Sequence, residues 1–274
     1  MNSSTKQIIA VAGCKGGVGK TLLAVNLALA MAGKGRRVVL MDGNLAVPDV
    51  GVSLGLEKDL EITCPGSCNA QELGEHTPLL REGPAGISVL TPGGRAIWRE
   101  SVEIGHAVRM IESLESLAPS LDTLIIDTSP GLAPDNVTLI QAAGEILIVI
   151  NQEILSLLDA VRMIRVLYRI YGVRKFSVVA NAVSNRRSGS SQFERLQSHL
   201  SNEVEIVLSY LGSIPFEKAV AESLAKQQAL LEASPDCRGS RAIQRIAHHL
   251  EAMPAIPPRG RIEFFLPTRI KERV

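Results

Sequence analysis

Residues 15–21 read Lys-Gly-Gly-Val-Gly-Lys-Thr, and these seven residues are the strongest indication of the fold. It follows the apolar run Gln7–Gly13, which predicts a buried strand, and it precedes apolar residues at helical spacing within Thr21–Gly33. Glycines let backbone N–H groups turn inward around phosphate oxygens, and the first turn of a helix adds partial positive charge. The stretch therefore predicts a phosphate-binding loop between a strand and a helix.

The side chains of this loop indicate how a nucleoside triphosphate would be held. Lys20 is expected to reach the β- and γ-phosphates, and Thr21 to place its hydroxyl on Mg²⁺. Backbone contacts are expected from Gly16, Gly17, Val18 and Gly19. The strict motif has glycine where this chain has Cys14, for which a small buried residue is a better interpretation than an activated thiol.

Two further apolar runs, Arg37–Asp42 and Thr123–Asp127, each end in an aspartate. A carboxylate at the end of a strand beside a phosphate-binding loop can hold Mg²⁺ or its waters. An aspartate after apolar residues is common, so either run alone is weak evidence. Both together, in this order, predict that Asp42 and Asp127 act with Thr21 at a magnesium site, the two carboxylates through water.

Apolar runs alternate with helical patterns along nearly the whole chain, which favours parallel strands covered on both faces. We predict one α/β domain, residues 1–252, with a single doubly wound, mostly parallel sheet, and a Pro-rich connection and basic, apolar tail over 253–274. Further expected strands are Gly86–Leu90, Ile146–Ile150, Phe176–Asn181 and Leu211–Pro215. Further expected helices are Val102–Leu117, Ile154–Tyr171 and segments near Lys218–Leu230 and Arg238–Leu250.

Lys15 distinguishes this loop from the strict motif, which needs only one lysine. The loop resembles the deviant Walker A signature K-G-G-x-G-K-S/T of the family of MinD, ParA and the nitrogenase iron protein. The resemblance implies that Lys15 reaches across an ATP-bound homodimer to the partner's phosphates, so that the nucleotide sets the oligomeric state. It also implies that Asp42 begins switch I and that Asp127 begins switch II, with Gly131 near the γ-phosphate.

Switch I departs from the family pattern. MinD-like members usually read D-x-D there, and the second aspartate helps position the attacking water, whereas this chain reads Asp42-Gly43-Asn44. An asparagine can hydrogen-bond a water but cannot take its proton. We therefore expect a slow or partner-stimulated ATPase, or a hydrolysis-deficient dimer that stays bound to ATP.

The resemblance also suggests where the nucleotide base lies. It assigns the base to Asn181, at the end of an apolar run, and to Pro215 and Phe216 after the last strand. A simple strand-ending turn is the alternative interpretation for these positions. Glu153 matches a family glutamate near the nucleotide of the dimer.

The resemblance covers nearly the whole chain and is strongest to the MinD-like regulators of flagellar number, FlhG and FleN. Five stretches carry it: residues 51–56, 127–131, 212–216, 225–229 and 258–265. It implies ATP binding, dimerisation at the membrane and control of flagellar assembly and gene expression. The implied partners are the flagellar GTPase FlhF, switch-complex proteins or the master activator FleQ. Residues 1–7 lack the segment with which some members stimulate the GTPase.

Two other functions compete with this one. A ParA-like ATPase that positions DNA or another cargo would bind DNA without sequence preference, and the net charge of +1 gives no whole-molecule attraction to nucleic acid. Sequence-specific DNA binding is not expected, because no helix-turn-helix pattern is present. An iron–sulfur reductase or scaffold would need cysteines near switch II, but none lies between Cys68 and Cys237.

The remaining features concern location and surface. No long apolar run or signal peptide is found, so we expect a cytoplasmic protein, by resemblance peripheral at the inner membrane face or a cell pole. The tail Arg259–Val274 suits a membrane surface or packing onto the domain. Cys64 and Cys68 fit a turn better than a zinc site. The helical arginine stripe at 162, 165 and 169 suits a solvated face, or a docking surface for an acidic partner or DNA.

Overall fold

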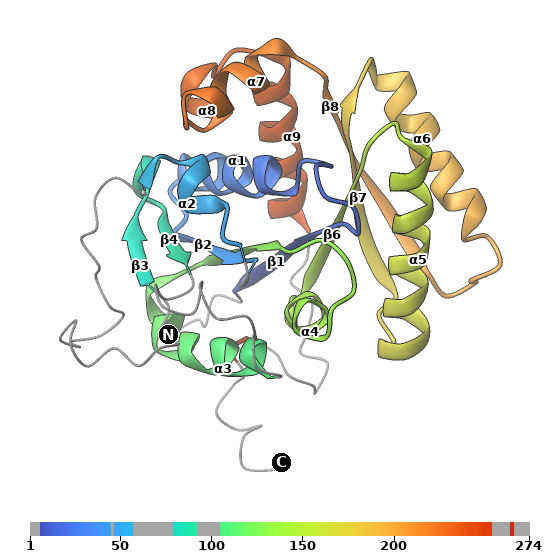
Figure 1. The fold of residues 1–274 in the computed structure, drawn as a ribbon, viewed down its shortest axis with the longest axis horizontal. Coiled ribbons are helices and arrows are strands. Elements are labelled where there is room, and N and C mark those ends of the chain that lie inside the picture. Colours follow the sequence, from blue (N-terminus) through green and yellow to red (C-terminus); the bar gives the residue numbers. More distant parts are fainter. Residues whose placement is uncertain (1–5, 45–46, 57–78, 92–104, 254–263, 266–274) are drawn as a thin grey trace.

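The computed structural model describes residues 6–44, 47–56, 79–91, 105–253 and 264–265. Their strands form one eight-stranded sheet of order β3-β4-β2-β5-β1-β6-β7-β8 (Figure 1). Every neighbouring pair is parallel except β3–β4, where β3 adds an antiparallel edge. Helices cover both faces of this sheet, so the predicted fold class is confirmed.

The elements follow the predicted order. The strands are β1 (Gln7–Ala12), β2 (Val38–Gly43), β3 (Leu79–Glu82), β4 (Ser88–Thr91), β5 (Thr123–Thr128), β6 (Glu145–Ile150), β7 (Lys175–Val183) and β8 (Val207–Pro215). The helices are α1 (Lys20–Ala32), α2 (Val50–Ser53), α3 (His106–Ser113), α4 (Pro134–Ala142), α5 (Ile154–Tyr171), α6 (Arg186–His199), α7 (Lys218–Ala225), α8 (Leu230–Ala233) and α9 (Arg238–Ala252). Short 3₁₀ turns lie at Pro84–Gly86 and Leu114–Ser120.

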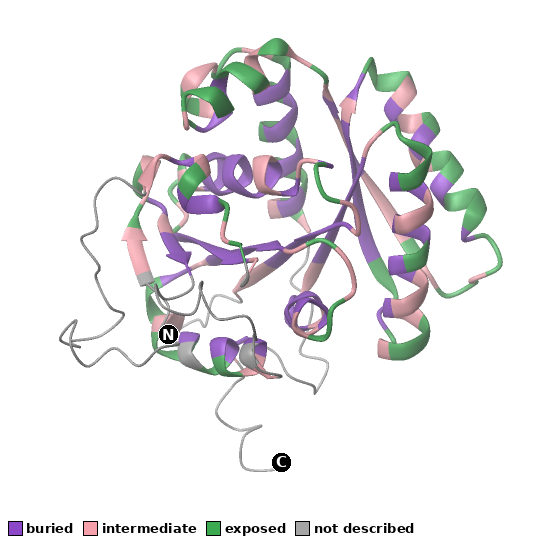
Figure 2. Cartoon of the chain, in the orientation of Figure 1, coloured by how far each residue is buried: buried purple, intermediate pink, exposed green. Residues whose placement is uncertain are grey.

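The central strands are buried on both faces, as Figure 2 shows. Successive side chains of a strand point to opposite faces of the sheet. Ile9 and Val11 of β1 therefore pack into the cluster formed with α1 and α9, while Ala10 and Ala12 face the clusters formed with α3 to α6. This two-sided burial explains why the strands read as continuous apolar runs.

Several elements differ from the sequence-based expectations. The helix expected over 102–117 begins at His106 in the described chain and gives way to a 3₁₀ turn from Leu114. The helix expected near 218–230 is divided into α7 and α8, because the chain turns between them with Gln227 at a φ of 52°. Both α4 and α6 were missed. Residues 186–191 of α6 are all polar or glycine, so their apolar periodicity is weak.

The arginine stripe of α5 is paired with acids. Arg162 donates to Asp159 at 2.9 Å, and both Arg165 and Arg169 form ion pairs with Glu203. These partners neutralise the stripe locally, which favours the solvated face over a docking surface.

Phe264 of the C-terminal tail is buried against the domain. Its side chain is 4 % exposed and packs in the cluster that contains Met110 and Ile111 of α3. This contact agrees with packing of that part of the tail onto the domain. Phe265 is partly buried against the same cluster. The other residues of Arg259–Val274, together with Cys64 and Cys68, lie outside the described residues. Within the described chain, no helix has the length and apolar character needed to cross a bilayer.

Candidate nucleotide-binding site

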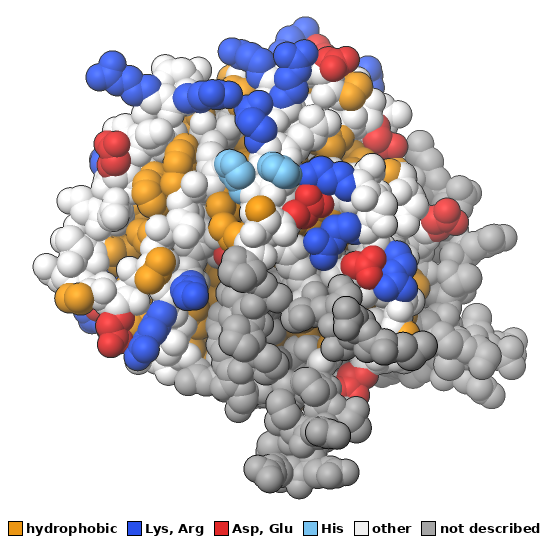
Figure 3. Space-filling view, turned by 180° about the vertical axis from the view of Figure 1, so that it is seen from behind, with side chains coloured by type: hydrophobic (Ala, Val, Ile, Leu, Met, Phe, Trp, Pro, Cys, Tyr) orange, Lys and Arg blue, Asp and Glu red, His pale blue; other side chains and the backbone are white. Residues whose placement is uncertain are grey.

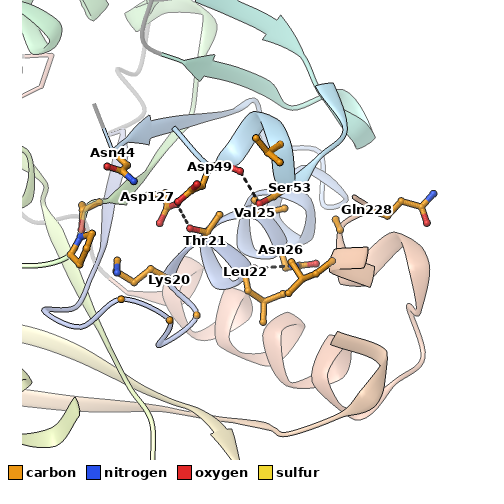
Figure 4. A pocket seen from close by; sticks show the side chains of 18 residues that line it. Lys20, Thr21, Leu22, Val25, Asn26, Asn44, Asp49, Ser53, Asp127 and Gln228 are labelled. Atoms are coloured by element: carbon orange, nitrogen blue, oxygen red, sulfur yellow. Dashed lines mark hydrogen bonds between the residues drawn. The ribbon is translucent and has the colours of Figure 1, made fainter. Parts of the chain in front are cut away.

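The strand order brings the predicted site segments together. Because β1 lies between β5 and β6, and β2 pairs with β5, the loops that follow these parallel strands meet at one edge of the sheet. The loops after β1, β2 and β5, together with residues of α1, α2, α7 and the segment after α7, surround a cavity of about 480 Å³ (Figure 4). Its lining includes Gly16, Gly17, Gly19, Lys20, Thr21, Asn44 and Asp127.

The loop between β1 and α1 has the backbone geometry that its glycines predict. Gly17 and Gly19 adopt φ values of 78° and 95°, a region that favours glycine. A Cβ atom on Gly19 would also collide with the side-chain amide of Asn181. Glycine is therefore required at position 19 both by the positive φ and by the lack of space for a Cβ atom.

Asn181 anchors this loop. Its buried amide donates a hydrogen bond to the carbonyl oxygen of Val18 at 2.8 Å. The pairing of β7 with β8 is irregular between Ala180 and Val183, and Ala182 has a φ of 52°. Such an irregularity redirects a side chain out of the strand pattern. Asn181 therefore positions the phosphate loop, a role that its place in the sequence did not indicate.

Lys20 is buried beneath the loop. Its ammonium group donates to the carbonyl oxygen of Lys15 at 3.3 Å, and burial lowers its pKa. An anionic phosphate in the cavity would offset the cost of burying this cation. Cys14 is half-buried, and its pKa is raised to about 11 mainly by burial, the opposite of an activated thiol.

Thr21 and Asp127 form the best-defined contact of the site. The threonine hydroxyl donates to one oxygen of Asp127 at 2.6 Å, as Figure 4 shows. The other oxygen of Asp127 is buried and has no hydrogen-bond partner among the described residues. Burial, followed by the charge of Asp42, raises the pKa of Asp127 to about 7 despite the threonine hydrogen bond.

These features fit a divalent cation. A hydroxyl and a carboxylate are oxygen ligands that Mg²⁺ prefers, and Mg²⁺ completes its shell with water and phosphate oxygens. The unpartnered oxygen of Asp127 is free to face such an ion. No group of three or more His, Cys, Asp or Glu side chains in the described chain is arranged as a metal site of its own.

Asp42 differs from Asp127. Its two oxygens accept backbone hydrogen bonds from Asn44 at 3.0 Å and from Val50 at 2.9 Å, and the side chain is fully buried. Burial raises its pKa to about 6 although these hydrogen bonds lower it. Asp42 is not among the residues that line the cavity. The two hydrogen bonds occupy both oxygens of Asp42 and link the end of β2 to the start of α2.

Asp49 is a cavity residue that the sequence did not predict. It lines the cavity, and Figure 4 places it near Thr21 and Asp127. It is the N-cap residue of α2, yet its side chain makes no capping hydrogen bond. The aspartate after Pro48 at the start of a short helix was the only available signal.

Lys15 is held within its own chain. Its ammonium group forms an ion pair with Glu153, the residue before the first turn of α5. Lys15 is not among the residues lining the cavity. Lys15 and Glu153 therefore lie together. Neither of them lines the cavity in which this chain's own loop would hold phosphates.

Pro215 and Phe216, which the resemblance assigns to the base, lie outside this cavity, and Pro215 lines a second cavity at the ends of β7 and β8. Pro215 is half-buried at the end of β8, and Phe216 is 75 % exposed. The Phe216 backbone donates to the carbonyl oxygen of Val183 at 2.9 Å, which is a strand-ending contact. Neither side chain lines the 480 Å³ cavity. The described geometry thus defines the phosphate and metal end of a site rather than its base end.

Comparisons with known proteins place these features in a wider group. A family model described as "ParA: NUBPL iron-transfer P-loop NTPase" matches residues 4–251. The chain is 35 % identical to the antiactivator FleN of Pseudomonas aeruginosa, covering 95 % of this chain and 92 % of that protein. It is 23 % identical to the flagellum site-determining protein YlxH of Helicobacter pylori, covering 90 % and 82 %.

The fold has solved counterparts. The septum site-determining protein MinD of Pyrococcus horikoshii, complexed with Mg-ADP, superposes with a TM-score of 0.68 at 21 % identity, covering 90 % of this chain and 96 % of that one. At this identity the likeness concerns the fold alone.

Proposed function

Because the chain belongs to the ParA/MinD family of P-loop NTPases, we propose that it is an ATP-dependent, dimerising switch that limits flagellar number. The observation that carries this proposal is the similarity to FleN over 95 % of the chain. A second relative, YlxH, is named a flagellum site-determining protein, which also links this group to flagella. Control of flagellar gene expression is part of the proposal, because the FleN relative is named an antiactivator.

The site supports nucleotide binding by the residues that surround the cavity. The loop N–H groups and Lys20 would hold the phosphates, and Thr21 and Asp127 would hold Mg²⁺. When bound, Mg²⁺ would neutralise phosphate charge and the charge of Asp127. Asn136 ties switch II to α4 by donating to the carbonyl oxygens of Ser129 at 2.8 Å and Gly131 at 2.7 Å.

Hydrolysis is proposed to be slow or to depend on a partner. Asn44 lines the cavity where MinD-like members usually carry an aspartate, and its amide cannot accept a proton from water. Asp49 also lines the cavity and is a carboxylate that could orient a water there. The chain thus retains the residues expected to bind phosphate, Lys20 and Thr21, but has Asn44 in place of the aspartate that would position the attacking water.

Dimerisation is proposed to depend on Lys15. In the described monomer this lysine is paired with Glu153, and the pair is partly exposed at the side chains. An exposed ion pair contributes about 0–1 kcal/mol, so exchange of Glu153 for a phosphate of a second subunit is energetically accessible. By resemblance, the dimer would act on FlhF, switch-complex proteins or FleQ at the membrane surface.

The proposal is tested by deleting the gene in its native bacterium and counting flagella per cell by electron microscopy. An increase that is reversed by the wild-type gene, but not by the Lys20→Ala gene, would support a nucleotide-dependent switch. An unchanged count would exclude flagellar number as the main role. ATP-dependent DNA binding would then be measured to examine the positioning alternative.

A further inference from the structure

A second cavity lies at the carboxyl ends of β7 and β8. Its volume is about 330 Å³, and it shares no lining residue with the nucleotide cavity. Four arginines line it, one from the start of α6 and three from α9: Arg186, Arg238, Arg241 and Arg245. The other lining residues carry no charge, and we call this cavity the arginine pocket.

The position of the three α9 arginines follows from the helix itself. Residues 238, 241 and 245 recur at helical spacing and fall on one face. The opposite face packs into the core through Ile243, Ile246 and Leu250. The arginine side chains are therefore kept at the surface, and Figure 3 shows Lys and Arg side chains gathered at one end of the rear face.

The charge of this pocket is poorly compensated. Arg238 pairs with Glu217 at 2.7 Å, and the same carboxylate accepts a hydrogen bond from the Gly239 backbone. For Arg186, Arg241 and Arg245, no side-chain hydrogen bond or ion pair is found with any described residue. No acidic residue lines the pocket. The arginines of α5 differ, because Arg162, Arg165 and Arg169 each have an acidic partner.

The neutral groups around the pocket also favour an anion. Arg186 is the first residue of the 14-residue helix α6, whose N-terminus contributes partial positive charge. Ser184 and Ser213 add hydroxyl groups to the lining. Guanidinium forks bind phosphate oxygens in pairs, and a cavity near 330 Å³ falls within the range of about 300–1,000 Å³ that is typical of small-ligand sites.

We propose that the arginine pocket is a second anion site, which binds a phosphate-bearing ligand with at least two negative charges, separately from the nucleotide. The ligand is either a soluble phosphorylated compound or the headgroup of an anionic lipid, because both present the same chemistry. The inference goes beyond the proposed flagellar switch and does not depend on it.

The test uses the full chain with its nucleotide site saturated by Mg²⁺ and a non-hydrolysable ATP analogue. Inorganic pyrophosphate is titrated by calorimetry into the wild type and into the Arg241→Ala/Arg245→Ala variant. The matched control is Arg187→Ala/Arg195→Ala, which removes two exposed arginines of α6 outside the pocket and changes the net charge equally. Losing two charged donors should weaken pyrophosphate binding by about tenfold or more, whereas the control should change it by less than about twofold.

Flotation with phosphatidylcholine vesicles, with and without cardiolipin, distinguishes the two sources, because the cardiolipin headgroup carries two phosphates. Flotation that needs cardiolipin and is lost only in the pocket variant indicates a lipid headgroup. Pyrophosphate binding without flotation indicates a soluble ligand. The proposal is overturned if the wild type responds to neither probe, or if pocket and control variants lose binding equally. A pocket variant with weaker ATP-analogue binding would also overturn it, because the pocket would then belong to the nucleotide site.

Discussion

Two buried carboxylates at the site, Asp127 and Asp42, lower the stability of the ligand-free protein when they ionise. Asp127 and Asp42 lie at the ends of adjacent strands, and burial raises the pKa of each, to about 7 and about 6. Ionising either group in the ligand-free protein is therefore costly. Asp42 recovers part of this cost through two backbone hydrogen bonds, whereas one oxygen of Asp127 has no hydrogen-bond partner among the described residues.

This cost predicts that Asp127→Asn stabilises the metal-free protein. The folded pKa, about 7, lies above the value of about 3.9 in an unfolded chain. Below pH 4 Asp127 is protonated in both the folded and the unfolded chain, and the stability of the folded protein is not reduced. As the pH rises through 7 the buried group must ionise, and this stability is lost. We expect the variant to gain about 1–3 kcal/mol at pH 8 in EDTA, and little at pH 4, by urea denaturation.

Asp122→Asn is a control of opposite sign. The hydrogen bonds from Arg37 lower the pKa of Asp122 to about 2, so its contribution is present above pH 4 and is lost only as the pH falls through 2. This variant should lose stability at pH 8. If Asp127→Asn is instead destabilising at pH 8, burial of the ionised Asp127 carboxylate does not lower the stability of the metal-free protein.

Asn44 decides the rate of hydrolysis in our proposal. Its side chain lines the cavity, and a carboxylate there could orient and deprotonate the attacking water. We expect Asn44→Asp to raise ATP turnover by about tenfold or more, measured by phosphate release under saturating ATP. Asn44→Ala should give no increase. Equal turnover in the wild type and Asn44→Asp would remove this explanation of a slow ATPase.

At the scale of elements, one asparagine couples switch II to a helix. Asn136 is buried in the first turn of α4 and donates to two carbonyl oxygens of the preceding loop. Gly131 in that loop has a φ of 89°, so the loop takes a shape that an L side chain would resist. The hydrogen bonds of Asn136 hold this shape in the absence of nucleotide.

We predict that Asn136→Ala lowers the free energy of unfolding by about 1–3 kcal/mol, because it removes two hydrogen bonds and leaves the partly buried carbonyl oxygens of Ser129 and Gly131 without this partner. Thr138→Ala on the same helix removes an exposed hydroxyl that donates to Pro134, and it should change stability by less than about 0.5 kcal/mol. Urea denaturation of both variants measures the difference. Similar values for the two would mean that the loop is held by other contacts.

At the scale of the molecule, the edge that carries the cavity is also suited to face a second subunit. Lys15 and Glu153 lie there, and the next residues, Ile154 and Leu155, are large apolar side chains left exposed. Exposed apolar side chains beside a functional loop indicate an interaction surface. This arrangement supports the proposed ATP-dependent homodimer.

Lys15→Ala should therefore separate dimerisation from nucleotide binding. Lys15 does not line the cavity, so we expect ATP affinity of the monomer to change by less than about threefold, while the Mg-ATP-dependent increase in mass is lost. Light scattering after size exclusion measures the mass, and calorimetry measures the affinity. Lys20→Ala should lose both properties. Dimerisation by the Lys15 variant would contradict the proposed role of this lysine.

The tail also contributes at this scale. Phe264 comes from the C-terminal segment yet packs beside α3 in the core. Phe264→Ala should lower the thermal unfolding midpoint and cost about 2–4 kcal/mol through the cavity that it leaves. The exposed Phe216→Ala is the control and should have little effect. Equal midpoints for the two variants would show that the tail is not anchored by this residue.

Elements encoded by neighbouring residues could be predicted from the sequence, whereas elements without a local pattern could not. The phosphate loop, the strands ending in Asp42 and Asp127, and helix α5 were all predicted, because each is written in consecutive or regularly spaced residues. Helices α4 and α6 were missed since neither has a strong apolar repeat. Asp49 was missed because a lone aspartate before a short helix has no distinctive spacing.

The fold class and the phosphate-binding loop could be predicted from the amino-acid sequence, because apolar runs and glycine positions act over a few neighbouring residues. Which distant groups meet became known from the three-dimensional fold. Asn181 supports the loop from 163 residues away, Glu153 pairs with Lys15, and the arginine pocket joins α6 to α9. Such contacts depend on the order of strands in the sheet and on the crossovers between them, which no local pattern specifies.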